Sequence, residues 1–247
     1  MILGIDTSAS RCAVALFRPD LMPVVLAERM DRGHAERLFP MIREVLAETG
    51  QGIDAVERIA VCTGPGSFTG LRVGVAAARG LALGRGIPAI GVTRFAALAA
   101  TFVRPQGLDE NGDRSGAVTM PRTLEEKVGW AERRPLAVAI AGRGAVYLQL
   151  FEAGTAITEP ALIAPDALAA TVPADAVPVG DGWAMEGVDS KGPGGRGEPV
   201  LLPEGLPDPV LLATLGAEAV PGPPPAPLYL RGADADPPRE APPRLLN

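Results

Sequence analysis

The hydrophobic pattern changes its period after residue 30, and this change limits the fold more than any other feature. Residues 2–6, 12–17 and 24–30 are short apolar runs, close enough together to favour three strands of an antiparallel meander. In residues 35–49 the apolar positions instead recur three and four apart, which indicates one face of a helix. A meander followed by helices excludes an all-α and an all-β protein.

Strands and helices alternate over the rest of this region. We predict strands at 58–63 and 88–92 and helices at 69–83 and 93–103, with Thr93 as the N-cap of the last helix. This order indicates a mixed sheet flanked by helices. The ribonuclease H-like halves of the actin, sugar-kinase and Hsp70 superfamily have the same order. The predicted fold class is therefore α/β, an actin/Hsp70-like (ASKHA) fold with two lobes.

The remainder of the chain is less regular. We expect an N-terminal lobe at 1–103, a smaller α/β lobe at 104–231 and a Pro-rich tail at 232–247. The second lobe starts with a polar, Gly/Pro-interrupted insertion at 104–134. Beyond it we predict a hairpin of strands at 136–141 and 145–151, a short helix at 165–170, a strand at 176–179 and a helix at 209–220.

Composition excludes several functions. The chain has one histidine, His34, and two cysteines, Cys12 and Cys62, too few to build a zinc site. Its net charge of −6 does not suit a protein that binds nucleic acid by itself. We expect both cysteines to be buried thiols in a reducing compartment. No basic leader follows Met1 and no apolar run reaches 18 residues, so we expect a cytoplasmic protein without a membrane span.

Two strand-end turns carry polar residues in motifs. Asp6, Thr7 and Ser8 follow the first apolar run, where a carboxylate and two hydroxyls can hold a magnesium–phosphate group, here as a vestigial phosphate loop. The same residues are more typical of a hairpin turn, in which Thr7 and Ser8 satisfy local backbone amides. The stretch GPGSFTGLR, residues 64–72, links a strand to a helix, and Ser67 or Thr69 is expected to cap that helix.

The helix predicted at 69–83 is small or apolar nearly all round. One side carries Leu71, Val75 and Ala78, and the other carries Gly70 and Gly74. Because a surface helix normally keeps one polar face, this pattern indicates a second buried contact, a protein–protein interface. A Ser-His-Asp triad is not favoured, since the GxSxG elbow is missing around Ser67.

Several segments resemble the bacterial TsaB (YeaZ) family. The matching segments are MILGIDTSASRCAVAL, HAERLFPMI, GPGSFTGLRVGVAAARGLALG and IPAIGVT in the first hundred residues, and GRGAVY, VGDGW and PLYLR further on. The chain departs from the family at residues 141–143, where Ala-Gly-Arg replaces Asp-Ala-Arg, and in the length of the insertion at 104–134.

The resemblance implies a role in making N6-threonylcarbamoyladenosine, the modified adenosine next to the anticodon of tRNAs that read codons starting with A. It implies a non-catalytic subunit that pairs with TsaD, which carries the metal and transfers the threonylcarbamoyl group, and that works with the ATPase TsaE. It further implies that the chain has no cofactor of its own, meets tRNA only through the complex and forms a homodimer when alone. TsaD holds its metal with two histidines on its first helix, whereas this chain has His34 alone.

In that family the first two helices of the N-terminal lobe form the pairing surface. On the corresponding helices we expect the contact at His34, Arg37, Met41, Gly70, Arg72, Gly74, Ala77 and Leu81. The competing hypothesis is an autonomous ASKHA-type kinase or ATPase that uses Asp6–Ser8 and the Gly180-Asp181-Gly182 turn as phosphate loops. A peptidase is a third alternative, which the lone histidine disfavours.

Overall fold

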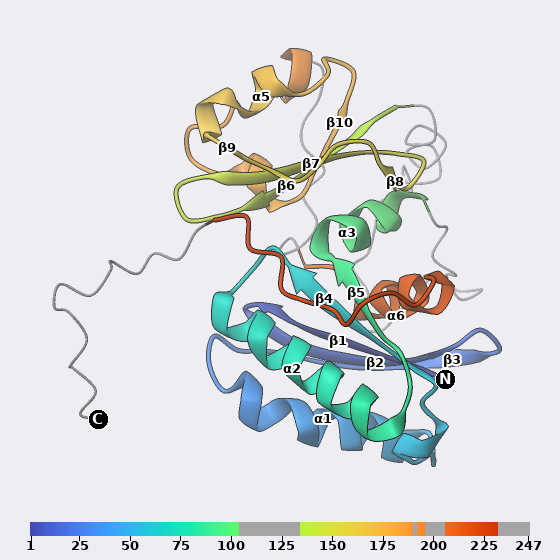
Figure 1. Cartoon of the computed structure of the whole chain (residues 1–247). Coiled ribbons are helices and arrows are strands. Elements are labelled where there is room, and N and C mark those ends of the chain that lie inside the picture. The colour runs from blue at the N-terminus through green and yellow to red at the C-terminus, as the bar shows by residue number, and fades with distance from the viewer. Residues whose placement is uncertain (104–133, 190–191, 196–205, 232–247) are drawn as a thin grey trace, which may run out of the picture.

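A five-stranded mixed sheet forms the base of the N-terminal half in the computed structural model, which describes residues 1–103, 134–189, 192–195 and 206–231 (Figure 1). Its order is β3-β2-β1-β4-β5. The first three strands are antiparallel neighbours, and β4 and β5 run parallel to β1. The strands are β1 (Ile2–Ala9), β2 (Arg11–Arg18), β3 (Leu21–Arg29), β4 (Arg58–Gly64) and β5 (Ala89–Thr93). The predicted ribonuclease H-like order is confirmed.

Helices α1 (His34–Glu48) and α2 (Phe68–Arg85) cover one face of this sheet (Figure 1). The alternation of β1 sends Leu3 and Ile5 toward them, into the largest apolar cluster of the described residues. From α1 the buried side of the helix supplies the residues that the helical spacing predicted, Leu38, Ile42, Val45 and Leu46. The caps are confirmed too: the Ser67 hydroxyl accepts from Gly70 N, and the Thr93 hydroxyl accepts from Ala96 N.

Helix α6 (Pro209–Glu218) covers the opposite face of the same sheet, although its sequence lies after the second lobe (Figure 1). Asp208 caps it through Val210 N, and Leu212 and Ala213 are fully buried. Gly216 lets it lie close to β4, because a Cβ there would come within 2.4 Å of the Ala60 Cβ. The segment at 209–218 was expected in the second lobe. Its hydrophobicity is nearly uniform around the helix, so the sequence pattern did not show which sheet it would cover.

The second sheet has the order β10-β6-β7-β8, with β9 also paired to β7. Its strands are β6 (Leu136–Ala141), β7 (Val146–Glu152), β8 (Thr155–Ala156), β9 (Ala161–Ile163) and β10 (Val177–Val179). Strands β6 and β7 form the predicted hairpin. Strands β8 and β9 were not predicted, because two or three residues are too short to show a period. Residues 104–133 of the expected insertion and all of the tail lie outside the described residues.

Helix α3 (Arg94–Val103) lies between the two sheets (Figure 1). Phe95 and Leu98 pack against the second sheet, whereas Ala97 joins a cluster with β5 and α6. On the far side of the second sheet lie α5 (Leu168–Thr171) and Trp183, whose indole donates to the Ala137 carbonyl over 2.9 Å. Short 3-10 turns complete the described fold at Ile53–Ala55, Pro165–Ala167, Asp181–Ala184 and Pro193–Gly195.

Two further connections join the halves. The Arg94 guanidinium, 4% exposed, lies 3.2 Å from Asp181 Oδ2, and the other oxygen of Asp181 accepts from Ala141 N over 3.0 Å. The segment 219–231, called the C-terminal strap here, runs from α6 across the first sheet to the second lobe (Figure 1). Leu228 N of the strap donates to the Thr63 carbonyl over 2.8 Å. In the described ranges no helix is long and apolar enough to span a bilayer.

The Asp181 connection gives a testable stability difference. We expect Asp181→Ala to lower the free energy of unfolding by about 1–3 kcal/mol, because the Ala141 amide and the buried Arg94 each lose a hydrogen-bond acceptor. The exposed Asp166, which caps nothing, is the matched control, and Asp166→Ala should change stability by less than about 0.5 kcal/mol. Urea unfolding measures both variants, and equal effects would contradict the assignment.

Candidate functional site

The turn at the end of β1 is closed by the chain itself. Asp6, Thr7 and Ser8 are each at most 1% exposed. Oδ1 of Asp6 accepts from both the amide and the hydroxyl of Ser8, at 2.9 and 2.6 Å, and Oδ2 lies 3.3 Å from Arg11 Nη2. The Thr7 hydroxyl donates to the Gly70 carbonyl over 2.7 Å. All three side chains therefore form hydrogen bonds with protein atoms. These internal hydrogen bonds do not support the interpretation of the turn as a phosphate loop.

Helix α2 closes the turn because three glycines remove the side chains that would block it. A Cβ on Gly66 would lie 2.0 Å from the Ser8 carbonyl oxygen, and one on Gly70 would lie 2.0 Å from the Thr7 carbonyl oxygen. At Gly74 it would come within 2.4 Å of Thr7 Oγ1. Such distances are impossible for real side chains, so the glycines let the helix start directly on the strand end.

This contact corrects part of the expected partner surface. Gly70 and Gly74 are buried and point at Thr7 rather than outward. Met41 is fully buried in the core beneath α1, where its length fills space between helix and sheet. His34 is 8% exposed, and its Nε2 lies 3.2 Å from the Ala9 carbonyl oxygen. These four residues are buried beneath the exposed sides of α1 and α2.

The other expected surface residues differ in exposure. Ala77 is buried at 8% and packs in the core, which corrects the expectation for it, and Leu81 is half-buried. Arg37 donates to Glu28 of β3 through Nε, over 2.8 Å, and to Glu44 through Nη1, over 2.6 Å, and its Nη2 donates to both carboxylates. These hydrogen bonds lower the pKa of both carboxyl groups. Arg72 is exposed, as expected.

The side of α2 that faces away from the sheet carries exposed apolar and small residues beside Arg72 and Arg79. Leu83 is 85% exposed and Phe68 48% exposed, and Phe39 of neighbouring α1 is 48% exposed. Between them, small residues at helical spacing leave the backbone accessible: Ala76, Gly80 and Gly84 are all exposed. We call these six residues the α2 outer face. A stripe of small residues flanked by exposed large apolar side chains suits close packing against a second helix.

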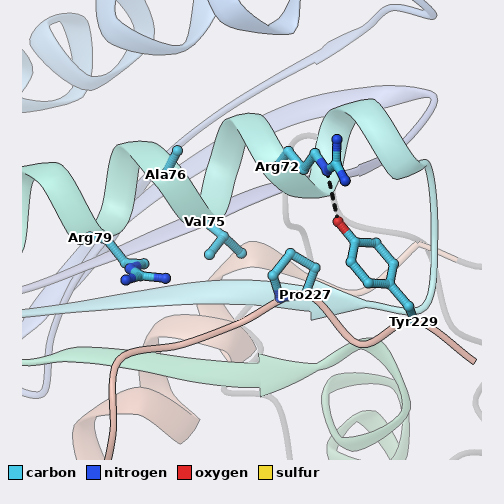
Figure 2. A pocket seen from close by; sticks show the side chains of 6 residues that line it. All are labelled: Arg72, Val75, Ala76, Arg79, Pro227 and Tyr229. Carbon is cyan, nitrogen blue, oxygen red and sulfur yellow. Dashed lines mark hydrogen bonds between the residues drawn. The ribbon is translucent and has the colours of Figure 1, made fainter. Parts of the chain in front are cut away.

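A groove runs between α2 and the C-terminal strap beside this face. It encloses about 470 Å³ and is lined by Arg72, Val75, Ala76, Arg79, Pro227 and Tyr229 (Figure 2). The Arg72 guanidinium lies 3.8 Å from the centre of the Phe68 ring, and its Nε donates to the Tyr229 hydroxyl over 3.0 Å. Sequence reasoning missed the strap residues as part of a site, although PLYLR was among the matching segments.

The two cysteine thiols near the turn at the end of β1 have low reactivity. Burial, followed by the nearby Asp6 carboxylate, raises the pKa of the Cys12 thiol to about 11 and that of Cys62 to about 12. Both thiols are therefore protonated at neutral pH, whereas a nucleophilic cysteine needs a lowered pKa. Among the described residues no three His, Cys, Asp or Glu side chains are grouped as a metal site. The chain is thus a two-lobed α/β protein, and its candidate functional site is the solvent-exposed α2 outer face with the groove beside it.

Known proteins of two kinds are similar to this chain. The family model of TsaD, tRNA N6-adenosine threonylcarbamoyltransferase, matches residues 25–110. The tRNA threonylcarbamoyladenosine biosynthesis protein TsaB of Haemophilus influenzae is 42% identical over 99 residues, 40% of this chain and 41% of its own length. Its counterpart of Escherichia coli is 34% identical over 134 residues, 53% of this chain and 54% of its own length. The chain thus spans about half the length of the curated relatives it matches.

A solved structure extends the likeness over almost the whole chain. A Pseudomonas aeruginosa protein, described as similar to the peptidase YeaZ, superposes with a TM-score of 0.67 at 29% identity. The alignment covers 93% of this chain and 99% of that one. Together with the TsaB relatives, this match makes the chain similar to TsaB/YeaZ proteins over almost its whole length.

The glycine contact with Thr7 predicts opposite effects for two substitutions in one helix. Gly74→Ala should lower the free energy of unfolding by about 1–3 kcal/mol, because its methyl group overlaps the Thr7 hydroxyl. Gly80→Ala should raise it by about 0.5–1 kcal/mol, since that position is open and alanine favours a helix. Urea unfolding of both variants gives the comparison, and a stable Gly74→Ala protein would refute the close contact.

The thiols give a second prediction. At pH 8 the native chain should not react with a thiol reagent such as DTNB on the minute scale, and the chain in denaturant should show both thiols. Because the unfolded thiols ionise near 9.0 and the folded ones only at about 11 and 12, stability should fall as the pH rises above about 9. Rapid labelling of the native chain would contradict this result.

Proposed function

We propose that this chain is a non-catalytic subunit in the biosynthesis of tRNA threonylcarbamoyladenosine. In this role it pairs with a tRNA N6-adenosine threonylcarbamoyltransferase of the TsaD type and supports its active arrangement. The names of the TsaB relatives support the pathway, and the match of residues 25–110 to the TsaD model supports a partner of related fold. Two related folds can pair through equivalent helices, in the manner of a pseudo-symmetric dimer.

The α2 outer face is the observation that carries the proposal. An 85% exposed leucine beside a stripe of alanine and glycine costs solubility unless a partner covers it. Gly70 and Gly74, which were expected on this surface, instead let α2 pack directly against the end of β1. A rigid helix loses little conformational freedom on binding, which favours a stable interface. In the absence of the partner the same face would bind a second copy, giving a homodimer.

The proposed division of chemistry assigns ATP and metal to the partners. TsaD would hold the metal and transfer the threonylcarbamoyl group, and TsaE would join the complex as its ATPase. Two observations on this chain support that division. Both thiols are protonated, and the side chains of the Asp6 turn bond to other protein groups. With its net charge of −6, the chain would reach tRNA through the complex, in the cytoplasm.

Leu83→Asp tests the pairing. The purified chain is mixed with the TsaD-type enzyme of the same organism, and complex formation is followed by gel filtration. We expect the aspartate to weaken the complex at least about a hundredfold, because it places a charge in an apolar contact, and to reduce modification of tRNA when TsaE and substrates are supplied. Val220→Asp is the matched control, since Val220 is 89% exposed and directly follows α6, which covers the sheet face opposite α2.

Two results would reject the proposal. One is a wild-type chain that neither binds the enzyme nor changes tRNA modification. The other is vigorous ATP turnover by the chain alone, abolished by Asp6→Ala, which would favour the autonomous kinase or ATPase.

A further inference from the structure

Two arginines face the groove between α2 and the C-terminal strap (Figure 2). Arg72 and Arg79 are seven residues apart, so they lie on one side of the helix about two turns, or 10.5 Å, from each other. Arg72 is held in place by the Phe68 ring and the Tyr229 hydroxyl. Within the described part of the chain, no hydrogen bond or ion pair involves Arg79. Neither guanidinium group is therefore paired with a carboxylate of the described residues, and Arg72 is fixed in position whereas Arg79 is not.

Neither wall of the groove supplies a carboxylate. Helix α2 contains no Asp or Glu between residues 68 and 85, and the strap contains none between 219 and 231. Neighbouring α1 is different, because Glu44 there neutralises Arg37. In a chain of net charge −6, an acid-free wall on both sides of two arginines is a local excess of positive charge. Such an excess favours an anionic occupant.

The lining also sets the shape of that occupant. Val75, Ala76 and Pro227 lie between the two arginines and form an apolar base (Figure 2). An extended polypeptide can place aliphatic side-chain carbons on this base and one carboxylate at each guanidinium, where paired hydrogen bonds form. Single-stranded nucleic acid fits less well, because one face of Phe68 is already covered by Arg72 and only two cations are present to meet phosphates.

We propose that this groove binds an acidic segment of the TsaD-type partner, with carboxylates spaced to meet Arg72 and Arg79. The inference rests on the proposed function, since it names the chemistry of the same partner. Ala76 belongs both to the α2 outer face and to the groove, so one partner can cover the two without a gap. The apolar face supplies the contact area, and the groove fixes the orientation of the partner along α2.

Calorimetric titration with the TsaD-type enzyme in low and high salt tests the groove. Arg79→Glu should weaken binding at least about tenfold in 50 mM NaCl, and the loss should shrink in 300 mM NaCl as screening increases. Arg18→Glu makes the same charge change at the β2–β3 turn, where Arg18 pairs with Asp20, and should change affinity less than about twofold. A Glu→Lys or Asp→Lys substitution in the partner should restore binding to Arg79→Glu.

The outcomes separate the two proposals. If Leu83→Asp abolishes the complex and Arg79→Glu leaves it unchanged, the pairing stands and the acidic-segment groove is wrong. A loss that appears only with tRNA present would assign the groove to nucleic acid, and a change confined to homodimerisation would assign it to a second copy; either result overturns the inference. A wild-type chain that does not bind the enzyme overturns both proposals.

Discussion

The hydrogen bond from the Thr7 hydroxyl to the Gly70 carbonyl marks the contact on which the rest of the structure depends. It requires the first turn of α2 to lie directly on the end of β1, and that approach is possible only because positions 66, 70 and 74 have no side chain. Once α2 is fixed in this way, its opposite side must face outward. The buried turn and the exposed apolar helix face are therefore two results of one packing constraint.

The hydrophobic period of each element determines which parts of the fold could be predicted from the sequence. The N-terminal elements follow from strong periods, and each observed boundary lies within three residues of its predicted one. Thr93 and Ser67 could be identified as caps because hydroxyl residues immediately precede apolar helical patterns. The pattern of α2 is ambiguous, since both sides are small or apolar. Sequence alone therefore assigned Gly70 and Gly74 to the partner surface, and the structure places them against Thr7.

Long-range contacts were beyond prediction for a different reason. Tyr229 meets Arg72 across 157 positions of sequence, and the local pattern of either residue contains no sign of the other. Arg94 and Asp181 are likewise 87 positions apart. The sequence also did not show which of the expected surface residues are exposed. A methionine at position 41 suits a core or an interface equally well, and only the packing beneath α1 decides between them.

Helix α6 has a consequence for how this protein can be made. The first sheet has one face covered by residues near the N-terminus and the other by a helix that starts at Pro209. During synthesis, the underside formed by Ile2 and Ala60 remains uncovered until almost nine-tenths of the chain has left the ribosome. The N-terminal lobe is thus discontinuous in sequence, and α6 is synthesised only after all the strands of the second sheet. A nascent chain ending near residue 103 would expose that apolar face.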